Sequence, residues 1–291
     1  MQIAEVKQTL RGPMIPVITN FNEDLSVDHA AIVDNVNFVI EHGIVQGKGV
    51  LLAAGAGGDF PMLSLDERKE VAKTIVEAAA GRTPVLVGAQ DTNPTVIMEM
   101  ARWAEEIGAY GIQLGPGYYY ESSDDDCLRL FRAVHDGTTR IALMIYNTHW
   151  EGYNMSFDQV ARLAELPRCV SLKWSTPDSA SYLRGVRRFA KRLAVVDNQG
   201  LHVMTYLLGG VGYITHLATI WPEHDLLVAE LLELGDYASA QEMLTVELAV
   251  VRLSSQDVAT DRRRKSRHQG GSRYLRTTGR AKSIADSQPH R

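Results

Sequence analysis

The sequence predicts an α/β protein of the (β/α)8 TIM-barrel class with a small helical appendage toward its C-terminal end. Eight short apolar runs alternate with amphipathic helical stretches along the 291 residues, and most of these runs are apolar nearly throughout. Continuous apolar strands separated by helices indicate a parallel sheet covered on its outer face, and eight repeats close most simply into a barrel. An open doubly wound sheet is the alternative.

The expected elements follow one another in a regular order. Within 64–81, Ser64 and Glu67 have the spacing of a capping box and Gly81 is a typical helix stop, while a second helical pattern covers 93–109. We expect the barrel over residues 1–222 and further helices over 223–253. The strand candidates lie at 14–19, 49–54, 84–89, 110–115, 141–147, 169–174, 193–198 and 211–217.

Charge divides the chain into an acidic body and a basic end. Residues 254–291 carry ten Lys or Arg against three Asp, a net charge of +7, which leaves −12 on the remainder. A segment so poor in apolar residues cannot offset its ordering entropy by burial, so we expect it to be disordered. It is either an arm that binds polyanions or, as we favour, a non-native or altered C-terminus. The acidic body is not expected to bind nucleic acid.

Composition and motifs exclude several classes of protein. No apolar run approaches the roughly 20 residues of a membrane span and the first residues lack a signal-peptide pattern, so we expect a soluble cytoplasmic protein without membrane contact. Cys127 and Cys169 match no metal or redox spacing. The histidines are scattered without a zinc motif, and Phe60 stands where a dinucleotide fingerprint needs its third glycine. We therefore expect no metal and no separate cofactor.

Lys173 lies in the apolar run CVSLKW, where an amine is costly to bury. Burial lowers the pKa of a lysine toward neutrality, and a neutral amine can condense with a ketone or a 2-oxo acid. A structural lysine paired with a carboxylate at the barrel rim is the alternative. Tyr146 and Asn147 end the preceding strand and Asp59 follows the second strand, so in a barrel these side chains share one mouth.

Six segments in one order make the chain resemble the dihydrodipicolinate synthase and N-acetylneuraminate lyase family of class I aldolases, from about Gly12 to Leu253. The segments are RGPMIPVITNFNEDLSVDHAA (11–31), GAGGDFPMLSLDER (55–68), GPGYYY (115–120), IYN (145–147), SLKW (171–174) and GGVGYIT (209–215).

The resemblance implies a role for each site residue. Lys173 becomes the Schiff-base lysine, with Tyr146 as the phenol that shuttles protons over the imine carbon. Tyr119, chosen from three consecutive tyrosines, assists Tyr146, either within its own chain or across the subunit interface of a homodimer or homotetramer. Substrate contacts are expected from Ala56, Gly57, Asn147, His149 and Ile214. The imine itself replaces a cofactor.

Two loops depart from the family pattern. Ala56 and Gly57 replace two hydroxyl residues that hold the substrate carboxylate and relay a proton, although backbone N–H groups of a glycine-rich turn still bind anions. We expect Gly57 to have a positive φ. Asp59 replaces a glutamate. After Tyr146 an arginine is missing and His149 and Trp150 stand nearby, which favours a bulkier, aromatic or hydroxylated aldehyde.

These observations predict a Schiff-base-forming lyase of the aldolase, hydratase-aldolase or dehydratase type. Its substrate would be pyruvate or another 2-oxo acid, with an aldehyde as the second partner. The changed loops argue against the synthase of lysine biosynthesis and against sialic acid cleavage. The alternative is a catalytically impaired barrel that binds or senses a 2-oxo acid.

Overall fold

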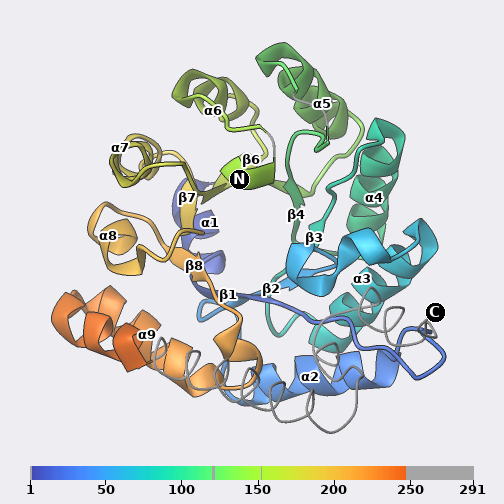
Figure 1. Ribbon diagram of the computed structural model, residues 1–291, viewed down its shortest axis with the longest axis horizontal. Helices are drawn as coiled ribbons and strands as arrows, with labels where there is room; N and C mark the ends of the chain where they lie inside the picture. Colours follow the sequence, from blue (N-terminus) through green and yellow to red (C-terminus); the bar gives the residue numbers. More distant parts are fainter. Residues whose placement is uncertain (1, 120–121, 152, 247–291) are drawn as a thin grey trace, which may run out of the picture.

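The computed structural model describes residues 2–119, 122–151 and 153–246, in which eight parallel strands close into a barrel (Figure 1). The strands follow one another around the barrel in chain order, and the last pairs with the first, with Met14 opposite Ile214. The predicted fold class is therefore confirmed and the open sheet is excluded.

The strands match the eight predicted runs, with shifts of a few residues at their ends. They are β1 Gly12–Pro16, β2 Val50–Ala53, β3 Val85–Gly88, β4 Gly111–Leu114, β5 Ala142–Asn147, β6 Cys169–Trp174, β7 Ala194–Asp197 and β8 Gly212–Ile214.

Helices follow the strands and form the outer ring of Figure 1, except the first helix, which precedes β1 and lies near the centre of the view. The α-helices are α1 Ile3–Thr9, α2 His29–Glu41, α3 Leu65–Ala79, α4 Pro94–Glu106, α5 Asp124–Asp136, α6 Phe157–Leu163, α7 Ser179–Phe189, α8 His202–Leu207 and α9 Pro222–Leu234. Short 3-10 turns are η1 Ala56–Gly58, η2 Phe60–Met62, η3 His149–Glu151 and η4 Leu217–Thr219.

Local sequence signals explain where α3 begins and ends. The Ser64 hydroxyl accepts a hydrogen bond from the Glu67 N–H, and the Glu67 carboxylate accepts one from the Ser64 N–H, so the predicted capping box is confirmed. Ala80 and Gly81 then adopt left-handed backbone angles, with φ of 48° and 73°. Glycine takes such angles without strain, and the helix stops where predicted.

Two apolar layers hold the barrel. Side chains on the outer face of the strands pack against the helices, while a second cluster, including Met14, Leu52 and Met144, fills the barrel interior. Val6 and Leu10, from α1 and the residue after it, join the interior cluster, and α1 contacts β6 and β7. Apolar side chains therefore fill the barrel core, and polar side chains gather where the strands end.

α9 lies within the ring of helices, between α8 and α2 in Figure 1, and it contacts β1, α8 and η4. The first part of the predicted C-terminal helical segment thus covers the barrel itself, because strand β8 needs an outer helix as the other strands do. Helical residues continue over 237–246. The expected disordered tail, 254–291, lies outside the described residues.

Candidate active site

Lys173 and Tyr146 lie side by side on neighbouring strands. They are Cα partners in the parallel pairing of β5 with β6, and the Lys173 Nζ lies 4.7 Å from the centre of the Tyr146 ring. The two residues are only 7% and 5% exposed. At this spacing the electron-rich face of the phenol stabilises a nearby ammonium group. The predicted pair of amine and phenol is thus brought together at the C-terminal ends of the strands.

The outer face of β6 fixes the inward direction of Lys173. Trp174 and Leu172 belong to the layer between strands and helices, so Lys173, between them in a strand of period two, points into the barrel. The Trp174 indole donates to the Tyr182 carbonyl at 3.2 Å. A Cβ at Gly185 of α7 would lie 2.5 Å from the same indole nitrogen, so only glycine fits beneath it. This packing holds the register that aims the amine inward.

The loop after β2 brings Ala56 and Gly57 to the mouth. Ala56 is exposed, whereas Gly57 lies against β1: a Cβ added there would stand 2.4 Å from Pro16 Cβ and 2.9 Å from His216 Cε1. The expectation of a positive φ at Gly57 is wrong, because the left-handed residues of this loop are Ala54 and Asp59. Glycine is required at position 57 by this close approach.

His216 is a mouth residue that the sequence analysis missed. It comes two residues after β8 and is exposed. Burial and, second, the positive charge of Lys173 lower the pKa of His216 below its ordinary value. The imidazole therefore lies within the electrostatic reach of the amine. Its position just after an inward-facing strand was the signal that could have identified it.

Gln113 is a second missed residue. It lies on β4 between Ile112 and Leu114, which pack toward the helices, so its side chain points inward, and it is almost fully buried. Its Nε2 lies 3.5 Å from where a Cβ of Gly55 would stand, which places the amide beneath the loop after β2. A polar residue inside an apolar strand was the available signal.

The loop after β5 carries His149 and Trp150. Their rings meet edge to face with centroids 4.9 Å apart, and Trp150 is 61% exposed. The Nδ1 atom of His149 is buried and makes no hydrogen bond within the described part of the chain. The loop thus presents an aromatic surface together with an imidazole nitrogen that no described protein group uses.

Asn147 holds this loop in place. Its amide donates to the Asn154 side chain at 3.0 Å and to the Ser175 carbonyl at 2.8 Å, and its oxygen accepts from the Met155 N–H at 2.9 Å. Both amide protons are therefore engaged by the protein. The predicted substrate contact is, in the structure, a link between the ends of β5 and β6.

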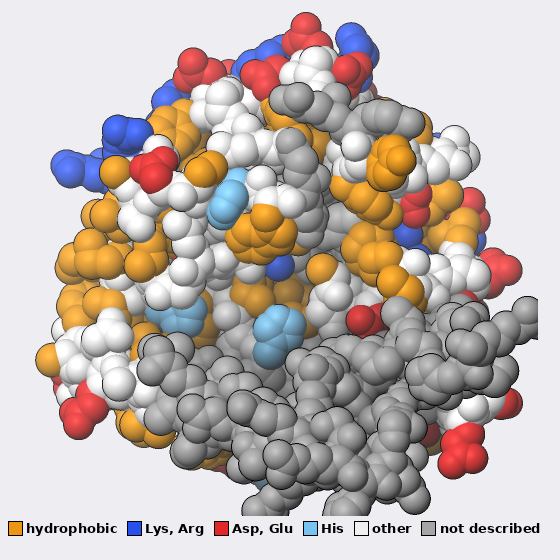
Figure 2. Space-filling view, viewed as in Figure 1, with side chains coloured by type: hydrophobic (Ala, Val, Ile, Leu, Met, Phe, Trp, Pro, Cys, Tyr) orange, Lys and Arg blue, Asp and Glu red, His pale blue; other side chains and the backbone are white. Residues whose placement is uncertain are grey.

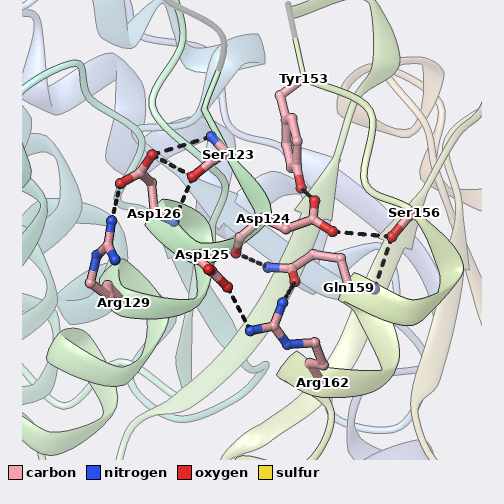
Figure 3. A network of polar contacts seen from close by, with 9 residues as sticks. All are labelled: Ser123, Asp124, Asp125, Asp126, Arg129, Tyr153, Ser156, Gln159 and Arg162. Carbon is pink, nitrogen blue, oxygen red and sulfur yellow. Dashed lines mark hydrogen bonds and ion pairs between the residues drawn. The ribbon is translucent and has the colours of Figure 1, made fainter.

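The far side of the same loop is tied to the start of α5 (Figure 3). The Tyr153 phenol donates to the Asp124 carboxylate, and Gln159 donates to the Asp124 carbonyl at 2.8 Å. Ser123 and Asp126 form a capping box at the start of α5. These bonds fix both ends of the segment that carries His149 and Trp150.

The remaining predicted residues differ in placement. Ile214 ends β8 opposite Met14 and packs, half-buried, against the interior cluster. Tyr119 is 82% exposed and has a φ of 85°, an unfavourable angle for a residue with a side chain. Tyr119 follows β4, whereas Lys173 and Tyr146 are direct partners in the pairing of β5 with β6.

Figure 2, in the same view, shows a hollow near the centre of this face, with histidine side chains around it and a blue Lys or Arg atom inside. Among the described residues, no group of three or more His, Cys, Asp or Glu is placed to hold a metal ion. None of the described helices is long and apolar enough to cross a membrane. Fold and site together define a (β/α)8 barrel with a lysine–tyrosine pair at its mouth, a site suited to carbonyl chemistry.

The model of the Dihydrodipicolinate synthetase family matches residues 9–259, and the chain belongs to this family. A 4-hydroxy-tetrahydrodipicolinate synthase of Acidiphilium cryptum is 32% identical over 213 residues, 72% of this chain and 71% of the relative. That of Laribacter hongkongensis is 29% identical over 236 residues, 80% and 79% of the two chains. Family membership supports an enzyme of the lyase or synthase kind.

Solved structures agree with this assignment. YagE, a prophage protein of the dihydrodipicolinic acid synthase family from E. coli K12, was solved in complex with pyruvate; it superposes with a TM-score of 0.76, 26% identity and coverage of 84% and 83% of the two chains. CdNal from Clostridium difficile, solved with mannosamine, shares the fold with a TM-score of 0.78 at 16% identity and covers 95% of this chain and 96% of its own.

Proposed function

We propose that this chain is a lyase that forms a Schiff base between Lys173 and pyruvate or another 2-oxo acid. The observation that supports it most directly is the buried Lys173 amine beside the Tyr146 ring at the strand ends, 4.7 Å from its centre. Family membership and the pyruvate complex of the E. coli relative agree with a 2-oxo acid as substrate. The imine supplies the electron sink, and no separate cofactor is required.

The reaction begins when the neutral Lys173 amine attacks the ketone carbon of the 2-oxo acid. A C–N bond forms, the carbonyl electron pair moves to oxygen, and Tyr146 carries one proton from nitrogen to that oxygen. The hydroxyl group then takes up one further proton and leaves as water, and the product is an iminium ion. The iminium accepts the electron pair of the adjacent C–C or C–H bond when that bond breaks and so becomes an enamine. The enamine returns the pair when it attacks an aldehyde or expels a hydroxyl group.

Ala56 and Gly57 are the residues that we assign to the substrate carboxylate. They lie at the mouth and carry no hydroxyl groups, so their backbone N–H groups are the donors that this turn offers. Asn147 is given a positioning role, because its amide protons hold the loop after β5. Ile214 contributes apolar contact from the opposite side of the barrel.

His149 and Trp150 are the residues that we assign to the second substrate. The loop offers an exposed indole beside the His149 ring, and its sequence YNTHWEGYN contains no arginine to bind a carboxylate. A neutral aromatic or hydroxylated aldehyde therefore fits it better than an anionic one. We therefore assign the chain an activity other than that of 4-hydroxy-tetrahydrodipicolinate synthase, for which its curated relatives are named. Turnover with a neutral aromatic aldehyde, compared with one bearing a carboxylate, tests this part.

A catalytically impaired barrel that binds 2-oxo acids is the second candidate, and one observation favours it. Ala56 and Gly57 provide no side-chain proton relay at the mouth. Such a protein would form the imine but would not turn over an aldehyde.

Trapping with borohydride tests the proposal. Protein mixed with pyruvate and reduced should gain one adduct per chain on the peptide that contains Lys173. Lys173→Arg should abolish it, because a guanidinium is too basic to condense, whereas the control Lys191→Arg, at an exposed position after α7, should retain it. An adduct that persists in Lys173→Arg contradicts the assignment. Turnover assays then separate the lyase from the impaired barrel.

A further inference from the structure

The His216 ring occupies the space next to Gly57 at the mouth of the barrel. Its Cε1 lies 2.9 Å from where a Gly57 Cβ would stand, so a side chain at position 57 and this ring compete for one volume. Pro16 closes the other side of that volume at 2.4 Å. The imidazole, which belongs to the segment after β8, thus fills the place beside the glycine-rich turn.

The ring is also coupled to the amine that reacts. The charge of Lys173 is the second cause, after burial, of the lowered pKa of His216. A protonated Lys173 therefore disfavours the charged form of the His216 imidazole. A neutral imidazole is in the state that accepts a proton, and the exposure of His216 leaves it open to substrate and water.

We propose that His216 is the second proton carrier of this site, an inference that rests on the proposed Schiff-base function. The His216 imidazole takes a proton from the Lys173 ammonium, directly or through one water, and so frees the amine for attack. Tyr146 moves one proton from nitrogen to oxygen within the adduct. The His216 imidazolium then gives its proton to the hydroxyl group, which leaves as water while the nitrogen lone pair completes the C=N bond.

The protons of this sequence balance without any further reactant. One ammonium group and one ketone become one iminium ion and one water, and both His216 and Tyr146 return to their starting states. The arrangement provides a proton relay that uses neither Ala56 nor Gly57, whose side chains carry no exchangeable proton.

The test is the rate at which the imine forms. The full-length protein is mixed with pyruvate at pH 7 and quenched with borohydride after increasing intervals, and the adduct on the Lys173 peptide is counted by mass spectrometry. His216→Gln should slow the appearance of the adduct by at least about tenfold. A positioned acid or base contributes roughly 10² or more, and the smaller figure is expected here because Tyr146 remains in place. The final extent should equal that of the wild type, since Lys173 is unchanged.

The matched control is His42→Gln, which removes an exposed imidazole just after α2. This residue lies at the end of the barrel where the strands begin, away from the site. It should react at the wild-type rate. In His216→Ala, added imidazole should restore the rate, because the space it leaves opens to solvent, whereas imidazole should not speed the wild type. Rescue by a small base is an outcome that a purely structural histidine does not give.

Three results overturn the inference. Wild-type rates in both His216 variants would show that another group carries the proton, and a slow His216→Ala that imidazole does not rescue would reduce the residue to packing. Absence of any pyruvate adduct in the wild type would remove the proposed function itself, and this outcome is distinguishable from the first two because it precedes any variant.

Discussion

The Lys173 amine and the Tyr146 ring illustrate how single residues set the chemistry of this barrel. An amine only 7% exposed needs compensation for lost hydration, and the phenol face 4.7 Å away supplies part of it. The same contact places the phenolic residue next to the nitrogen where protons must move. Stability and proton transfer therefore depend on the same pair.

Tyr146→Phe should lower kcat by roughly 10² to 10⁴, the usual contribution of a positioned acid or base, because the ring remains and only its proton is lost. The substrate is whichever 2-oxo acid the trapping experiment identifies. Steady-state kinetics measure the effect, and the melting temperature should stay at the wild-type value.

The control for this variant is Tyr110→Phe, which removes a phenol oxygen just before β4, at the opposite end of the barrel. Its kcat should be that of the wild type. A loss below about threefold in Tyr146→Phe, far under the acid-base range, would mean that another group carries the proton.

At the scale of elements, the turns between helices and strands are held by side chains from the helix ends. Glu105, near the end of α4, accepts backbone hydrogen bonds from Thr139, Arg140 and Ile141, the residues that lead into β5. Burial raises the pKa of Glu105, but these N–H groups favour the carboxylate and the net shift is downward. The charged form of Glu105 thus helps to place the strand that carries Tyr146.

Glu105→Gln should lower the free energy of unfolding by about 1–2 kcal/mol at pH 7. In the variant an amide NH2 group faces a backbone N–H, so a hydrogen bond that a carboxylate oxygen accepted in the wild type is lost. A carboxyl group whose pKa is lower in the folded than in the unfolded protein stabilises the fold at pH values above its unfolded-state pKa. This contribution is lost as the pH falls through the pKa of the folded state. The difference between wild type and variant should therefore shrink in acid.

Urea denaturation at several pH values measures this difference, with Glu106→Gln, an exposed neighbour, as the control. Equal stability of Glu105→Gln and wild type at pH 7, or a gap that stays constant into acid, would contradict the role assigned to Glu105.

At the scale of the whole molecule, the exposed Tyr119 is the residue through which the expected homo-oligomer can be tested. It is 82% exposed and holds a left-handed φ of 85°, a backbone angle that is strained for a residue with a side chain. A symmetric dimer would allow this phenol to enter the mouth of a second copy. A role of Tyr119 in the site of a partner subunit therefore requires a homo-oligomer.

Mixing two inactive variants tests this arrangement. Tyr119→Phe and Lys173→Arg each leave every site defective, but a mixed dimer contains one site with both groups intact, so random pairing should restore about a quarter of the sites. Turnover after co-expression measures it. Activity no higher than the mean of the separate variants would place Tyr119 outside the partner's site.

The sequence predicted the strands and the helix boundaries well because their signals are local. Apolar runs and the Ser64–Glu67 capping box depend on residues a few positions apart. The positions of Lys173 and Tyr146 at the ends of adjacent strands followed from the same pattern. The sequence analysis attributed the glycine at position 57 to a positive φ, which was wrong. The structure shows instead that Pro16 and His216, which are remote in sequence, leave no space for a side chain there.

By itself the sequence determined a parallel barrel with an amine and a phenol at one mouth, since strand period and strand order decide which side chains point inward and at which end. Only the tertiary structure decided what surrounds that pair. Barrel closure pairs β8 with β1 and so brings His216 against Gly57, and the chain path after β4 leaves Tyr119 exposed. Such neighbours depend on the register of strands far apart in the chain, which no local pattern of residues encodes.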